Sequence, residues 1–209
     1  MRKQLLSTLT AAVIAAALGL TPPAGLRAAA KGTIHETQPV LTTPDGFLLG
    51  SQVPGAYASL VRNKTGVTTN VHTMVAAPGA YTVWWVIFNH PASCATYLCT
   101  YDEPDLVSHA VGRVVLPGEG GNLSASLRVG GPLGEVLYEG QDPGLANPKG
   151  ALVLLVIRYH GLALPGQLSQ QLKTYLGGCP DGGPPCQDVQ LVVFRGNECT
   201  GACADPSAL

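Results

Sequence analysis

Two histidines and one arginine stand where they could form a polar site. His90 follows an apolar run that ends at Asn89, and Arg158 and His160 end a second apolar run. Imidazole is the commonest metal ligand and transfers protons near neutral pH. If the two runs are neighbouring strands, His90 and His160 can converge with Arg158 at one edge of the fold. No H-x-H or H-E-x-x-H motif supports such a site, and the alternative is that both histidines only cap strand ends.

An acidic turn offers a second set of possible ligands. Asp102 and Asp105 lie in Tyr101-Asp-Glu-Pro-Asp105, directly after a pair of cysteines. Clustered carboxylates on irregular backbone suit hard cations such as calcium. The D-x-D-x-D-G pattern is missing and Pro104 restricts the backbone, which favours a solvated turn. We predict no cofactor; should a metal ion bind, His90, His160, Asp102 and Asp105 are the candidate ligands.

The motifs of common enzymes are missing from the sequence. No serine lies in a G-x-S-x-G context, and no glycine-rich loop carries the lysine of a phosphate site. We therefore expect a non-catalytic protein that binds a small molecule, a glycan or a protein partner. Two alternatives remain open: a metalloprotein or enzyme with a His/Arg site, and a structural component of the cell envelope.

The six cysteines predict disulfide bonds. They form three local couples, each among turn-forming residues: Cys94 and Cys99, Cys179 and Cys186, and Cys199 and Cys203. Six cysteines allow 15 pairings. We favour the three local bridges, with a link between the C-terminal tail and the 179–186 loop as the alternative. None of the couples has the C-x2-C spacing of a zinc ribbon, so disulfides are favoured over zinc.

The N-terminus resembles an export signal. Arg2 and Lys3 precede an apolar run from Leu5 to Leu20, and a small-residue A-x-A segment ends at Ala30. The run is shorter than the ~20 residues of a spanning helix. We expect residues 1–30 to be cleaved and the remaining chain to be exported to the periplasm or beyond the cell, with no later segment that spans a membrane.

Composition excludes several classes of protein. Charged residues make up only 12% of the chain, and the formal net charge is -1. Removal of the leader's basic residues makes the chain more acidic, which argues against nucleic-acid partners. The 46% hydrophobic content argues against disorder, and 26 glycines with 17 prolines indicate a turn-rich fold.

The hydrophobic pattern predicts an all-β domain over residues 31–198, followed by a C-terminal tail at 199–209. Strands are expected at 33–41, 56–62, 67–73, 81–89, 106–116, 123–129, 151–159 and 188–194, with hairpins around 63–66 and 117–121. One helix is predicted at 167–176, from leucines spaced four apart. We expect an antiparallel, Greek-key, immunoglobulin-like β-sandwich with disulfide-tied loops.

The strand from Tyr81 to Asn89 is apolar on both faces, and the strand at 151–159 is similar. Both should therefore be central and covered on each side. We expect the 130–150 segment and the helix to supply this cover. Trp84 and Trp85 must point to opposite faces, so at most one can join a ligand platform. Trp84, Arg158, His160 and His90 are the candidate ligand-binding residues.

Two resemblances support a β-rich exported protein. Pro78-Gly-Ala-Tyr81 resembles the corner of immunoglobulin-like and fibronectin-type sandwiches, which implies that the Tyr81 hydroxyl bonds back to the backbone. The segments Pro78–Asn89, Val156–Gly161 and Cys186–Gln190 are similar to a group of exported bacterial proteins of unknown function. This likeness implies no particular activity.

Overall fold

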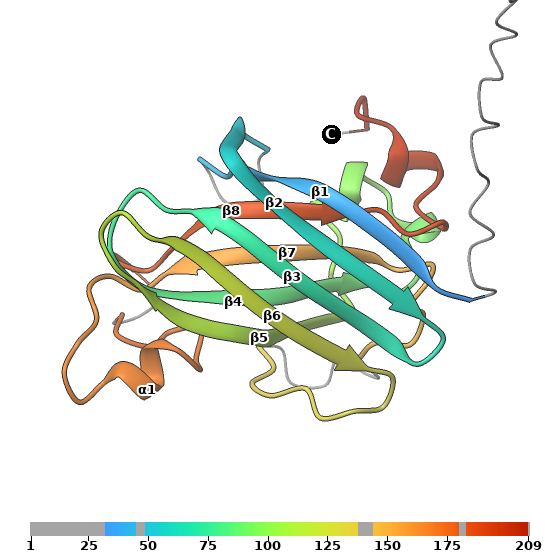
Figure 1. Cartoon of the computed structure of the whole chain (residues 1–209). Coiled ribbons are helices and arrows are strands. Elements are labelled where there is room, and N and C mark those ends of the chain that lie inside the picture. Colours follow the sequence, from blue (N-terminus) through green and yellow to red (C-terminus); the bar gives the residue numbers. More distant parts are fainter. Residues whose placement is uncertain (1–31, 45–48, 138–143, 180–182, 209) are drawn as a thin grey trace, which may run out of the picture.

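Eight antiparallel strands form a single sheet (Figure 1). The computed structural model describes residues 32–44, 49–137, 144–179 and 183–208, so the predicted leader lies outside the described residues. The strands are β1 (Ile34–Thr42), β2 (Gln52–Asn63), β3 (Gly66–Met74), β4 (Gly79–Phe88), β5 (Leu106–Val115), β6 (Gly120–Arg128), β7 (Leu152–Tyr159) and β8 (Gln187–Phe194). All eight predicted strands are confirmed, with ends shifted by a few residues.

The sheet is nearly closed and barrel-like. Its strand order is β5-β4-β7-β8-β1-β2-β3-β6, and the two end strands β5 and β6 approach each other. Arg113 on β5 donates to the carbonyl of Asn122 on β6 at 3.3 Å. The all-β prediction is confirmed, whereas the immunoglobulin-like sandwich is not, because every strand belongs to one continuous ladder.

The predicted hairpins differ in outcome. Residues 63–66 do join β2 and β3 as neighbours, and Asn63 Oδ1 accepts the Thr65 amide at 2.8 Å within the turn. The hairpin expected around 117–121 is wrong, because the two strands that it joins, β5 and β6, are not paired in the sheet. β6 pairs along its whole length with β3, from Gly66 opposite Arg128 to Met74 opposite Gly120, while β5 pairs with β4. The 116–119 turn therefore links the two ends of the sheet.

Apolar side chains form two cores on opposite faces of the sheet. The inner core contains Val83, Trp85 and Ile87 of β4 and side chains from most other strands. The outer core contains Trp84, Val86 and Phe88 of the same strand. The prediction that β4 is central and covered on both faces is confirmed, since all ten of its residues are buried.

The predicted helix is much shorter than expected. α1 (Leu168–Gln171) makes one turn, and its apolar side is not the buried side. Leu168 is 38% exposed and Gln171 is fully buried. Gln171 Nε2 donates to the carbonyls of His160 and Leu162, so hydrogen bonds rather than leucine packing hold this segment. No helix among the described residues has the length and apolar character needed to cross a membrane.

The corner before β4 is tied as the resemblance implies. The Tyr81 hydroxyl donates to the carbonyl of Ala77 at 2.6 Å. Burial raises the pKa of Tyr81 to about 12, and the neighbouring Tyr159 adds to the effect. This corner recurs here although the fold is one nearly closed sheet.

Candidate functional site

Disulfide-tied loops cover the outer face of β4, β7 and β8. The three predicted local pairs are confirmed: Cys94–Cys99, Cys179–Cys186 and Cys199–Cys203. In the described part of these loops lie short 3-10 helices: η1 (Pro91–Ser93), η2 (Tyr97–Cys99) and η4 (Gly201–Ala204). The C-terminal residues pack on the η2 loop, where the Tyr97 amide donates to the carbonyl of Ala208 at 2.9 Å.

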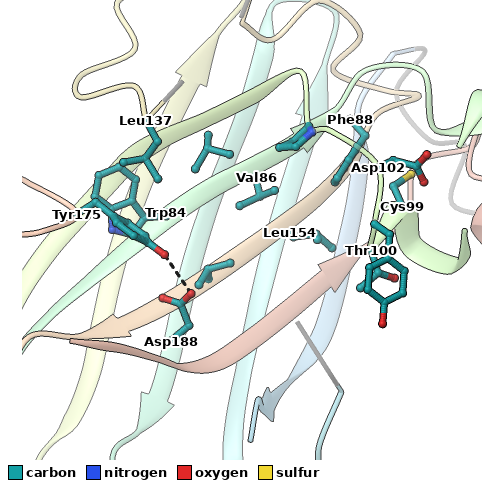
Figure 2. A pocket seen from close by; sticks show the side chains of 14 residues that line it. Trp84, Val86, Phe88, Cys99, Thr100, Asp102, Leu137, Leu154, Tyr175 and Asp188 are labelled. Carbon is teal, nitrogen blue, oxygen red and sulfur yellow. Dashed lines mark hydrogen bonds between the residues drawn. The ribbon is translucent and has the colours of Figure 1, made fainter. Parts of the chain in front are cut away.

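The cover leaves a pocket over the outer face of the sheet (Figure 2). Its floor consists of buried side chains from three neighbouring strands: Val86 and Phe88 of β4, Val107 of β5, and Leu154 and Val156 of β7. Loop residues form the walls: Cys99, Thr100, Tyr101, Asp102, Pro104, Leu137 and Tyr175. The cavity volume is about 240 Å³. The lining is apolar with a few polar groups, which is the composition typical of small-molecule sites.

The two ends of the pocket differ. At one end Trp84 meets the ring of Tyr175 edge-on, with ring centres 5.3 Å apart. Trp84 is fully buried, which makes this the closed end. At the other end lie Phe88 and Asp102 (Figure 2). Tyr101, next to Asp102, is 75% exposed and is the most exposed lining residue, so the mouth lies beside it.

A hydrogen-bonded group closes the end near Trp84. Arg158 Nη1 donates to Asp188 Oδ1 at 2.8 Å, and the Tyr175 hydroxyl lies 3.3 Å from Asp188 Oδ2. The Arg158 guanidinium also lies 3.7 Å from the centre of the Tyr175 ring, a cation–π contact. Asp188 thus has its charge compensated, and Arg158 sits behind the tyrosine rather than on the pocket surface.

Asp102 holds the loop at the mouth. Its carboxylate accepts the amides of Ala95 and Thr96 at 3.2 and 3.3 Å and the hydroxyl of Thr96 at 2.9 Å. These bonds fix the Cys94–Cys99 loop against the sheet. Asp105 has a separate structural role, because its carboxylate accepts the amide of Asn89 at the end of β4.

His160 belongs to a buried hydrogen-bond chain that leads to Trp84 at the closed end of the pocket. Its Nδ1 donates to the carbonyl of Gly177 at 2.9 Å, so its Nε2 must accept from the Thr82 hydroxyl at 2.7 Å. Thr82 in turn accepts the indole Nε1–H of Trp84 at 2.8 Å. Burial lowers the pKa of His160; the Gly177 bond opposes this shift and the charge of Arg158 adds to it.

His109 supports the same region from β5. Its ring meets Trp84 edge-on at 5.3 Å between centres. Burial lowers its pKa, and a bond with the Leu172 backbone works against that shift. Sequence reasoning did not single out His109, since nothing in the pattern of this strand shows that its half-buried ring packs against Trp84.

The expected convergence of His90 with His160 is wrong. β4 and β7 are antiparallel, with Tyr81 opposite Tyr159 and Phe88 opposite Leu152. His160 therefore lies at the start of β4, where its amide bonds to Ala80, and exposed His90 lies beyond the other end of that strand. His90 follows β4 and His160 follows β7. Because these strands are antiparallel, residues that follow them lie at opposite ends of the pair.

The described residues do not favour a metal centre at the predicted ligands. His160 lies beside Cys179 and Cys186, and Asp102 lies beside Cys94 and Cys99, with possible donor atoms within 4.8 Å of one another. All four cysteines are in disulfides, and a metal binds the thiolate form. Asp105 is engaged with backbone, as described above.

Of the four predicted ligand-binding residues, only Trp84 is among the lining residues. Arg158 bonds to the lining residue Asp188, and His160 is linked to Trp84 through Thr82. His90 is not among the lining residues. The lining residues that the sequence did not reveal come mainly from loops, above all Tyr175 and Leu137. The one signal in the sequence was that β4 is apolar on both faces, which predicts that other segments pack over its outer face. The pocket lies between that face and those segments.

The fold and the pocket define an all-β protein of one nearly closed sheet with a small-molecule-sized cavity on its outer face. A scan against protein-family models gives no match to this chain, and comparison with curated proteins and with solved structures gives none either. The resemblance to exported bacterial proteins stays a prediction.

Proposed function

We propose that this chain is an exported, non-catalytic binding protein that holds a small, mainly apolar molecule in the outer-face pocket. The leader-like N-terminus and the three disulfides support export to the periplasm or beyond the cell, because disulfides persist in oxidising compartments. The ligand assignment depends on the pocket.

The observation that carries the proposal is the cavity that the loops leave over an apolar floor. Val86, Leu154 and Val156 lie on the outer face of a sheet whose inner face already forms the main core. If the loops served only to shield these side chains from water, they could pack against them without leaving a cavity. A walled cavity with an apolar floor and a few polar groups is a common mark of a ligand site.

The size of the cavity limits the ligand. At about 240 Å³ the cavity is smaller than the roughly 300–1,000 Å³ of sites for drug-sized ligands, so its ligand must be small. Ligands of this size bind with dissociation constants between about 1 mM and 1 µM.

The first test titrates the protein with 1-hexanol and follows tryptophan fluorescence. The chain has two tryptophans, and they lie on opposite faces of β4. We expect a saturable change that is lost in Trp84→Phe and retained in Trp85→Phe. Equal changes in both variants, or a change that does not saturate, would argue against the pocket.

The second test fills the cavity. Val86→Phe places a ring over the floor, so we expect hexanol binding to disappear while the melting temperature stays equal or rises. Val129→Phe makes the same change at an exposed position outside the pocket and should leave binding unaltered. Undiminished binding by Val86→Phe would overturn the proposal.

A structural role in the cell envelope is the competing proposal. It predicts assemblies of this chain on size-exclusion chromatography and labelling at the cell surface, with no saturable hexanol binding. The His/Arg site for a metal or a reaction is not proposed, since His90 and His160 lie at opposite ends of β4.

A further inference from the structure

The charge of the pocket is unbalanced. Two of the lining residues are acidic, Asp102 and Asp188, and none of the lining residues is a lysine, arginine or histidine. Arg158 compensates Asp188 at 2.8 Å. Within the described ranges no lysine or arginine forms an ion pair with Asp102. The mouth of the pocket therefore carries the net negative charge.

The Asp102 carboxylate retains capacity for a further bond. Two carboxylate oxygens offer about four acceptor positions, and the loop uses three of them. Among the described residues, Oδ1 accepts the Ala95 amide and no second donor, so this oxygen can take another one. By contrast, both Asp188 oxygens already face donors from Arg158 and Tyr175.

Aromatic rings border the same end. Phe88 and Tyr101 line the pocket beside Asp102, and Figure 2 shows Phe88 and Asp102 together, away from Trp84 and Tyr175. An aromatic face attracts a cation through its quadrupole, and a carboxylate adds direct charge attraction. An ammonium group therefore meets favourable partners at this end and no positive charge among the lining residues.

The shape places the rest of such a ligand. Outer-face residues Trp84, Val86 and Phe88 follow one another along β4, so the floor extends about 13 Å at roughly 3.3 Å per residue. Between the two ends the floor is aliphatic, with Val86 and Leu154 at its centre (Figure 2). An unbranched or slender apolar body fits along it.

From these observations we infer that the pocket selects a small apolar amine, with its ammonium group at Asp102 and its apolar body directed toward Trp84. The inference rests on the proposed function and adds the charge of the ligand to it. It also excludes carboxylates and phosphates of the same size, because no cation of the lining would meet them.

Three compounds of matched length test the inference: hexylammonium, 1-hexanol and hexanoate, each titrated by calorimetry at pH 7 and low salt. We expect hexylammonium to bind about tenfold more tightly than hexanol and hexanoate to bind most weakly. If hexanol binds and hexylammonium is no tighter, the charge selection is wrong but the pocket stands. If none of the three binds saturably, the proposed function fails as well.

Asp102→Asn and Glu103→Gln separate the carboxylate at the mouth from general surface charge. Glu103 is exposed and is not a lining residue, so its variant removes one negative charge nearby without altering the pocket. We expect Asp102→Asn to lose the tenfold preference for hexylammonium over hexanol, and Glu103→Gln to keep it. An unchanged preference in Asp102→Asn would overturn the inference.

Replacing Asp102 can disturb the loop that its carboxylate holds, so a test without substitution is also needed. Varying the salt concentration provides one. Asp102 is only partly buried, so its attraction for a cation should weaken as ionic strength rises. Between 20 and 500 mM NaCl, we expect hexylammonium affinity to fall severalfold and hexanol affinity to stay level or increase. A salt-independent affinity for hexylammonium would contradict binding at Asp102.

Discussion

The Nε2 atom of His160 lies 2.7 Å from the hydroxyl oxygen of Thr82, and this contact fixes the imidazole in its neutral form. The other ring nitrogen faces a carbonyl, which can only accept, so the proton is on Nδ1. A second proton on Nε2 would leave the Thr82 hydroxyl without an acceptor for its own hydrogen. The geometry therefore acts in the same direction as burial, which lowers the pKa of His160.

Stability should therefore fall on acidification. The pKa values of His160 and His109 are lowered in the folded state, while the unfolded chain titrates near 6.5. Below about pH 6.5 the unfolded chain binds more protons, so the free energy of unfolding decreases until the pH reaches the folded-state pKa values. We expect the melting temperature to fall between pH 7 and 5.

Two variants check the source of this pH dependence. His160→Gln should lower the melting temperature at pH 7 but flatten its decrease with pH, because one of the responsible groups is gone. His35→Gln alters an exposed histidine and should leave the profile unchanged. A wild-type profile that is flat between pH 7 and 5 would contradict the prediction.

Arg62 should be essential for stability although it lies far from the pocket. Its guanidinium is fully buried, forms an ion pair with Glu36, and donates to the carbonyls of Ala151 and Phe194 at 2.8 and 2.9 Å. It thus links β2 to the start of β7 and the end of β8. Removing one partner of a buried ion pair costs about 3–5 kcal/mol.

Chemical denaturation of Arg62→Met measures that cost directly. Arg128→Met removes an exposed arginine and should change the free energy of unfolding by less than about 0.5 kcal/mol. Similar stabilities for the two variants would show that the buried network contributes little.

The Tyr81 corner gives a third prediction. Tyr81→Phe removes the bond to the Ala77 carbonyl and should lower the free energy of unfolding by about 1–3 kcal/mol. The folded-state pKa of about 12 exceeds the unfolded value of 10, so the associated stability is present below pH 10 and is lost between 10 and 12. Spectrophotometric titration should show one tyrosine that ionises late, absent in Tyr81→Phe and retained in Tyr57→Phe. Loss of the late step in Tyr57→Phe would show that it does not belong to Tyr81 and would contradict the prediction.

Local patterns account for what the sequence predicts well. The β4 strand, the turn at 63–66 and the three disulfides all depend on residues close together in the chain. Asp188 shows why the pocket could not be foreseen. It lies opposite Arg158 only because the register of β7 and β8 shifts between Ile157 and Arg158. Such shifts, like the closing of β6 onto β3, depend on packing between distant segments.

The Cys94–Cys99 bond should matter more for binding than for stability. It closes a short loop, so the chain-entropy model gives about 2 kcal/mol of stabilisation. The same bond holds Cys99 and the Asp102 turn in the pocket wall. We expect the double variant Cys94→Ser/Cys99→Ser to lower hexanol affinity severalfold or more.

The matched control is Cys199→Ser/Cys203→Ser. That bridge closes a loop of similar length, and neither cysteine lines the pocket. The two double variants should therefore lose comparable stability in urea, while only the Cys94/Cys99 variant loses binding. Equal loss of hexanol affinity in both would mean that the pocket depends on the whole outer cover, including the C-terminal tail, rather than on the loop at its mouth. Retained affinity in both would mean that strand residues alone bind the ligand.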